Sequence, residues 1–194
     1  MRKTARFLVE KGFTLVELLI VIALIGVLAV AVLAAINPLE QLNRARDTGM
    51  ESDASQLLAA IDRYYATQEK FPWVVPPVTN DSALAMVSAA DPSVGVCGPA
   101  DCDKGNGLLL AQYELKSEFQ NRKFIKATSD IDKLWMGKAS GASSSVYACW
   151  VPTSMAKRAQ AIRHTNVIPD TDPSPCAATD WGTLASACFI CIPR

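Results

Sequence analysis

The chain has 194 residues, half of them hydrophobic, and its 19 basic residues balance 19 acidic ones. This length accommodates one modest domain with an appendage. The balanced charge excludes proteins that are drawn to nucleic acid by a strong overall positive charge.

The chain begins with a short basic segment, residues 1–12. Its charged residues are Arg2, Lys3, Arg6, Glu10 and Lys11. Because positive charge favours the cytoplasmic side of a membrane, we expect this end to stay in the cytoplasm and the later residues to be exported. Loss of this segment would leave the protein slightly acidic.

An apolar segment, residues 13–36, follows directly. Its exceptions are Thr14, Glu17 and Gly26, and no charged residue occurs after Glu17. As a helix, the uncharged part would be roughly 28 Å long, close to the ~30 Å hydrocarbon thickness of a bilayer. We therefore predict that the chain crosses or anchors in a membrane once.

An amphipathic helix is predicted over residues 37–69. Apolar residues recur there at three- and four-residue spacing from Met50 to Tyr65. Gly26 and Pro38 are the expected helix interruptions, since proline removes a backbone donor and disfavours helix just before it. Together, residues 13–69 would form a stem about 85 Å long.

The remaining residues, 70–194, are predicted to form a small α+β head. A short helix is expected at residues 82–90. The best strands are residues 145–151 and 187–192, and we expect the head to contain a short antiparallel sheet. Residues 108–125 fit either a helix or a strand.

All six cysteines lie in this head: Cys97, Cys102, Cys149, Cys176, Cys188 and Cys191. An even number in an exported domain predicts three disulfides, with fifteen possible pairings. The Gly98-Pro99 turn favours a local bridge from Cys97 to Cys102. A four-cysteine zinc site formed by these two residues with Cys188 and Cys191 is the alternative.

The loop that contains Cys102 also places side-chain oxygens at alternating positions, as calcium loops do. The candidate ligands are Asp101, Asp103 and Asn106. Gly105 at the fifth position and Gln112 at the twelfth depart from the calcium pattern. A turn closed by a disulfide accounts for the loop equally well, and we predict no cofactor.

Basic residues gather at two places in the head. They are Arg122, Lys123 and Lys126, and then Lys157, Arg158 and Arg163 beside His164, the single histidine. Such residues could contact phosphates, although a basic cluster without a binding motif is more often a solvated face. No nucleophile elbow, phosphate loop or paired-acid motif occurs, so we predict no catalytic residues and no enzyme.

The most specific motif lies where the basic and apolar segments meet, at Lys11-Gly12-Phe13-Thr14-Leu15-Val16-Glu17. It resembles the N-terminal motif of the type IV pilin and type II secretion pseudopilin superfamily, and the likeness continues through residues 37–47. The resemblance implies that prepilin peptidase cleaves between Gly12 and Phe13, and that the new Phe13 amine is methylated. It also implies that Glu17 pairs with the Phe13 amine of a neighbouring subunit.

The position of Glu17 gives this pairing a physical reason. A charged glutamate at mid-depth in a bilayer helix costs roughly 2.5 kcal/mol or more, so it needs a partner. Glu17 lies about 6 Å along the helix from Phe13. A neighbour displaced by about one helical turn could therefore pair its amine with this carboxylate. The shared apolar surface would supply most of the association.

The resemblance implies a structural filament subunit, made as a single-pass membrane protein and later displayed at the cell surface. Its implied partners are membrane lipid, prepilin peptidase, copies of itself and related pilins, and an inner-membrane assembly platform with its cytoplasmic ATPase. Three alternatives remain: a minor pilin whose head captures DNA, a surface or a secreted substrate; an enzyme or receptor domain on a plain anchor; and an ordinary signal cleaved after Ala29-Val30-Ala31.

Overall fold

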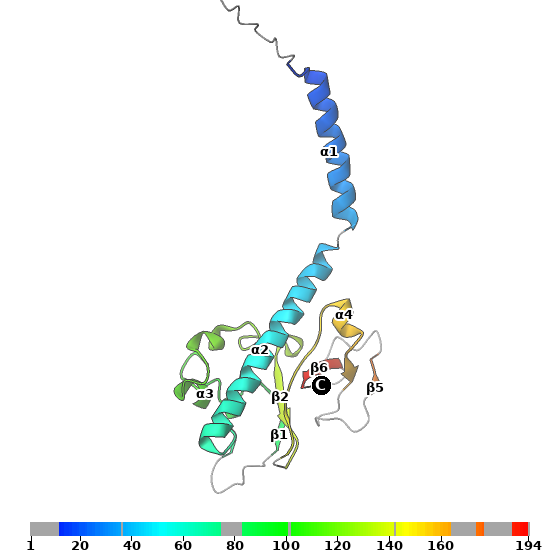
Figure 1. The fold of residues 1–194 in the computed structure, drawn as a ribbon. Coiled ribbons are helices and arrows are strands. Elements are labelled where there is room, and N and C mark those ends of the chain that lie inside the picture. Colours follow the sequence, from blue (N-terminus) through cyan, green and yellow to red (C-terminus); the bar gives the residue numbers. More distant parts are fainter. Residues whose placement is uncertain are drawn as a thin grey trace, which may run out of the picture. The chain divides into compact units, whose positions relative to one another are not determined.

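The computed structural model describes residues 12–35, 37–74, 83–100, 102–141, 143–163, 174–176 and 188–193. The chain divides into two compact units, Met1–Leu39 and Glu40–Arg194. The first of these contains the apolar helix α1, and the second contains nearly all of helix α2 together with the sheet (Figure 1).

Helix α1 spans Leu15–Ala35 and is apolar on every side. Its residues Leu15–Leu33 form the one helix, among the described residues, that is long and apolar enough to cross a membrane. The large apolar side chains of this span are exposed in the single chain. The helix passes through Gly26 without a break, so the interruption expected at Gly26 is absent.

Helix α2 spans Pro38–Gln68 and begins at the interruption expected at Pro38. Proline is tolerated at this first helical position because its missing N–H would have no helical partner there. One face of the helix is buried, at Asp47, Met50, Ala54, Leu57, Ala60, Ile61 and Tyr64. The helix ends where Glu69 takes a left-handed conformation, with φ of 54°. The compact unit thus begins at Glu40 and includes the amphipathic helix.

The sheet is antiparallel throughout, with strand order β1-β2-β3-β6-β4-β5. The strands are β1 Leu84–Ser88, β2 Trp135–Lys138, β3 Val146–Trp150, β4 Ile162–Arg163, β5 Ser174–Pro175 and β6 Cys188–Ile192. The two predicted strands correspond to β3 and β6, which pair directly with each other. Figure 1 shows α2 running across the sheet formed by β1 and β2.

The core lies on both faces of the sheet because successive strand residues point to opposite sides. Ala148 and Trp150 of β3 belong to the large cluster that includes Leu57 of α2. Cys149, between them, belongs to a smaller cluster with Phe189 on the other face. The α+β fold expected from the sequence is therefore confirmed, with α2 supplying one layer of the head.

Short helices connect the strands of the sheet. They are the 3₁₀ turns η1 Pro92–Val94, η2 Ser117–Asn121 and η3 Asp130–Asp132, and the α-helices α3 Leu108–Ala111 and α4 Met155–Arg158. The region 108–125 thus contains helical turns and no strand. The helix predicted at residues 82–90 is wrong, because its described part forms β1, which pairs with β2. Tertiary pairing overrides local propensity in such a short segment.

Three disulfides join all six cysteines, and no cysteine is free. They are Cys97–Cys102, Cys149–Cys191 and Cys176–Cys188. The local bridge forms around the Gly98-Pro99 turn, as the sequence favoured. The zinc alternative is wrong, because Cys188 and Cys191 are each bonded to a different cysteine. Cys149–Cys191 links two residues that lie opposite each other on β3 and β6.

Candidate functional site

The N-terminal end of α1 is organised by Thr14 and Glu17, which bond to each other in both directions. The Glu17 carboxylate accepts hydrogen bonds from the Thr14 backbone N–H and hydroxyl, both at 2.8 Å. The Thr14 hydroxyl oxygen accepts a bond from the Glu17 N–H at 3.2 Å. This reciprocal arrangement is a capping box, which satisfies N–H groups that have no partner inside the helix.

The capping box gives Glu17 a local partner that the sequence interpretation missed. The signal was present, because threonine followed three residues later by glutamate at the start of an apolar helix is the usual capping-box pattern. An unpaired glutamate would be costly in a bilayer. In the single subunit the Glu17 carboxylate is held against the end of its own helix, so its oxygens are partly satisfied before any neighbour arrives.

Gly12 and Phe13, the two residues that flank the expected cleavage point, lie outside the helix and are accessible. Phe13 is 86% exposed. A Cβ atom built at Gly12 would meet no atom within 4 Å. The fold of the described chain therefore gives no steric reason for glycine at this position. Lys11 and the rest of the basic segment lie outside the described residues.

Residues 9–33 match the family model for the prokaryotic N-terminal methylation motif. This chain carries a prepilin-type methylation motif. The motif is the cleavage signature of type IV pilins and pseudopilins, and it confirms the family resemblance drawn from Gly12, Phe13 and Glu17. No curated protein and no solved structure matches the chain.

The prepilin-type motif and the apolar helix together define the class of the protein. The motif indicates a structural, pilin-like protein rather than an enzyme, and it implies processing by prepilin peptidase and assembly into filaments. Helix α1 fits a single-pass membrane anchor.

A second organised site lies on α2, where three acidic residues hold the segment that follows β3. Glu40, Asp47 and Glu51 are spaced by seven and four residues, so they share one face of the helix. We call these three residues the acidic clasp. Asp47 is only 1% exposed, and burial of a charge is costly unless hydrogen bonds compensate for it.

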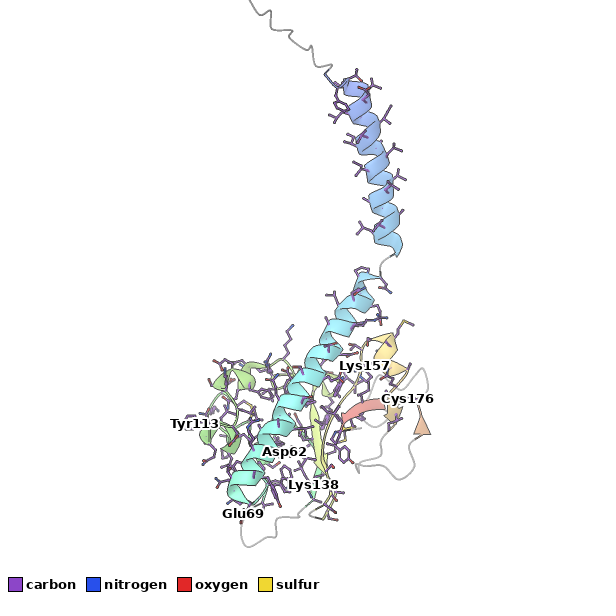
Figure 2. All side chains as sticks on the ribbon, viewed as in Figure 1. Asp62, Glu69, Tyr113, Lys138, Lys157 and Cys176 are labelled. Carbon is purple, nitrogen blue, oxygen red and sulfur yellow. A yellow bond between two sulfur atoms is a disulfide. The ribbon has the colours of Figure 1, made fainter. Side chains whose placement is uncertain are left out.

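The bonds of the clasp reach residues from Thr153 to Lys157, just before and within α4. Asp47 accepts bonds from the backbone N–H groups of Thr153 (3.0 Å) and Ser154 (2.8 Å), and from their hydroxyls. Glu40 accepts the Met155 N–H at 3.1 Å. Lys157 forms an ion pair with Glu51 at 2.6 Å, and Figure 2 shows it beside α2. The clasp therefore fixes α4 against the first turns of α2.

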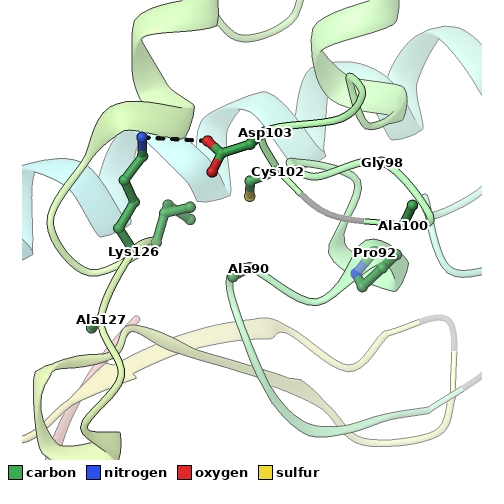
Figure 3. Close-up of a pocket in the computed structure, with 9 residues that line it drawn as sticks. Ala90, Pro92, Gly98, Ala100, Cys102, Asp103, Lys126 and Ala127 are labelled. Carbon is green, nitrogen blue, oxygen red and sulfur yellow. Dashed lines mark ion pairs between the residues drawn. The ribbon is translucent and has the colours of Figure 1, made fainter.

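Two of the three candidate calcium ligands, Asp103 and Asn106, lie within the described residues. Asp103 forms an ion pair with Lys126 at 3.4 Å, at the edge of a pocket of about 460 Å³ (Figure 3). Asp101 lies outside the described residues. Within the described ranges, no group of three or more histidine, cysteine, aspartate or glutamate side chains could hold a metal ion.

The first basic cluster borders a groove of about 810 Å³ beside α2. Two arginines that line the groove, Arg122 of the cluster and Arg46 of α2, pair with acidic residues of the same groove. Arg122 lies 3.5 Å from Asp53, and Arg46 lies 2.6 Å from Asp132. Burial raises the pKa of the Asp53 carboxyl, and the nearby Arg122 opposes that rise. Internal pairing therefore reduces the positive charge that this groove offers to an anion.

Two residues of the second basic cluster, Lys157 and Arg158, are also bonded to groups of their own chain. Lys157 is bound by the clasp, and the guanidinium of Arg158 donates to the Pro152 carbonyl oxygen at 3.1 Å. His164 lies outside the described residues. Neither cluster gives a specific observation in favour of nucleic acid as a partner.

Proposed function

We propose that this protein is a filament subunit of the type IV pilus or type II secretion class, matured by cleavage between Gly12 and Phe13. Before assembly it is a single-pass membrane protein whose N-terminus faces the cytoplasm. An inner-membrane assembly platform with its cytoplasmic ATPase then transfers it into a filament of copies of itself and related pilins. The methylation motif at residues 9–33 is the observation that carries this proposal.

The local structure at Gly12 supports cleavage at this bond. A side chain at position 12 would meet nothing in the folded chain, yet the residue is glycine. A requirement from outside the fold accounts for this, since a peptidase that holds an extended backbone at the membrane surface would exclude a side chain there. Phe13 is exposed, so its new amine is available for methylation.

Assembly then requires Glu17 to exchange partners. In the single subunit the carboxylate bonds to Thr14, and in the filament it would pair with the Phe13 amine of a neighbour. The new pair has opposite charges, so it replaces neutral donors by a charged one, and charge-assisted bonds are roughly twice as strong. The apolar surface of α1 supplies most of the association, and the charge pair sets the register between subunits.

The first experiment is intact-mass measurement on the native protein purified from its own cells. We expect a chain that begins at Phe13 and carries one additional methyl group. Gly12→Val should remain at full length, while its thermal unfolding matches that of the uncleaved wild type, because no contact of the fold requires glycine there. A native chain that begins at Met1 or near Val32 would contradict the maturation step.

The second experiment tests Glu17 directly. Glu17→Ala should be cleaved, should accumulate in the membrane and should form all three disulfides. Filament yield should fall severely, because removing one partner of a buried pair costs about 3–5 kcal/mol. Asp62→Ala is the matched control, since Asp62 is exposed on α2 and outside the clasp. Wild-type filament yield from Glu17→Ala as the only copy would refute the pairing role.

A further inference from the structure

Two large apolar side chains of the compact unit Glu40–Arg194 are exposed at the level of the first turns of α2. Leu42 is 68% exposed, and Met155 at the start of α4 is 72% exposed. Both residues lie at the same height along the axis of α2. The clasp holds Met155 there, because the Met155 N–H donates to Glu40, two residues before Leu42. Together, Leu42 and Met155 form what we call the apolar collar.

The two members of the collar lie on different sides of α2. Leu42 follows Glu40 by two residues, which corresponds to about 200° around the helix, whereas α4 lies on the Glu40 side. A protein partner docked on one face would cover only one of them. The surface of a bilayer surrounds a helix that emerges from it on all sides. It would therefore cover both Leu42 and Met155 at one height along the axis of α2.

The length of chain between the membrane span and α2 places the collar within reach of the bilayer. Leu33 ends the candidate span and Pro38 begins α2, five residues later. An extended chain of that length covers at most about 18 Å. The headgroup layer on each side of the hydrocarbon is roughly 5–8 Å thick. A fully extended connection would hold the collar beyond this layer, whereas a bent connection allows the collar to reach it.

We propose that the apolar collar rests in the headgroup region of the bilayer while the subunit is stored in the membrane. Leu42 and Met155 insert between lipid headgroups, and the acidic clasp keeps α4 at the level where Met155 can do so. The proposal rests on anchoring by α1 and is independent of filament assembly. It gives α4, which contributes no buried residue to the core, a role at the membrane.

A fluorescent probe on a single cysteine tests the collar. All six native cysteines are in disulfides, so Met155→Cys or Leu42→Cys supplies the only free thiol for an environment-sensitive dye. The full chain is reconstituted at low density in vesicles of phosphatidylethanolamine and phosphatidylglycerol. We expect blue-shifted emission at both positions, and loss of fluorescence when lipids spin-labelled in the headgroup region are included.

Tyr113→Cys is the matched control for this experiment. Tyr113 is 93% exposed, and its neighbour Glu114 bonds to Arg63 near the far end of α2. Arg63 lies 23 residues after Glu40, which corresponds to about 35 Å along the helix. The dye at position 113 should keep its emission in water and should not be quenched by the spin-labelled lipid.

Three results would overturn the proposal. Emission and quenching at positions 42 and 155 that match those at position 113 would show that the collar stays in water. A blue shift that grows with protein density, without lipid quenching, would identify a second copy as the occupant. Failure of the chain to float with the vesicles would remove the anchor and the collar together. Loss of filaments in vivo with unchanged lipid quenching would leave the collar standing and count against the filament role alone.

Discussion

The sharpest prediction about stability concerns Asp47. Its carboxylate is buried and binds four donors, namely the backbone N–H and the hydroxyl of both Thr153 and Ser154. In Asp47→Ala the two hydroxyls can rotate toward other acceptors, whereas the two backbone N–H groups cannot. Each buried donor left without a partner costs about 1–3 kcal/mol, so we expect a total loss of about 2–6 kcal/mol.

Asp47→Asn should lie between the wild type and Asp47→Ala. The amide retains one acceptor oxygen, and in the wild type the closest bonds to the two backbone N–H groups go to different oxygens. The Thr153 N–H also lies 3.1 Å from the oxygen that accepts the Ser154 N–H. An amide oxygen in that position still accepts both N–H groups, so less than half of the loss should remain. Since small domains are stable by only ~5–15 kcal/mol, Asp47→Ala would remove a large share of the total.

The measurement is urea unfolding of the full chain in detergent, followed by tryptophan fluorescence, to which Trp150, 1% exposed in the core, contributes. Asp62→Ala is again the control, because Asp62 is exposed on the same helix. We expect the free energy of unfolding to rank Asp62→Ala, Asp47→Asn, Asp47→Ala from highest to lowest. If Asp47→Ala unfolds at the same urea concentration as the control, the clasp contributes nothing to stability and our reasoning fails.

Three further predictions concern single contacts. Burial raises the pKa of Asp53, so its charged form is disfavoured in the folded state. Asp53→Asn should therefore be slightly more stable than the wild type at pH 7. In acid-unfolding curves this difference in stability should vanish as the wild-type carboxyl becomes protonated. Thr14→Val removes the hydroxyl bonds of the capping box and leaves the backbone bond to Glu17, so amide hydrogen exchange measured by NMR in micelles should quicken in the first turn of α1. Replacing both Cys149 and Cys191 by serine opens a loop with a sequence separation of 42 and should lower the calorimetric stability of the head by about 4 kcal/mol.

The sequence predicted the elements whose evidence lies within one segment. The apolar helix follows from its own composition, and α2 follows from the spacing of Met50, Leu57 and Tyr64 along one face. The sequence also predicted that the cysteines are oxidised, from their even number and exported location. Each of these three predictions depends on a local sequence pattern or on the cellular compartment, and none of them requires knowledge of the tertiary fold.

The features that the sequence could not predict depend on partners far along the chain. Asp47 meets Ser154 across 107 positions, so the clasp is invisible as a local pattern. The segment 84–88 becomes a strand because β2 is available as a partner, and no short-range signal identified it. The pairing of Cys149 with Cys191 likewise follows from the register of β3 and β6.

The clasp and the buried face of α2 together would help the head to resist unfolding under the pulling force that the proposed function implies. Extraction of α1 from the membrane applies force to the head through the start of α2. If α2 were attached only by apolar contacts from Met50 onward, its first turns could peel away from the head before the core resisted. Glu40 and Asp47 lie ahead of that point, and they join those turns to α4 and to the end of β3. On the proposed function, the force passes through these bonds to the segment that follows β3, and the head moves without unfolding from the first turns of α2.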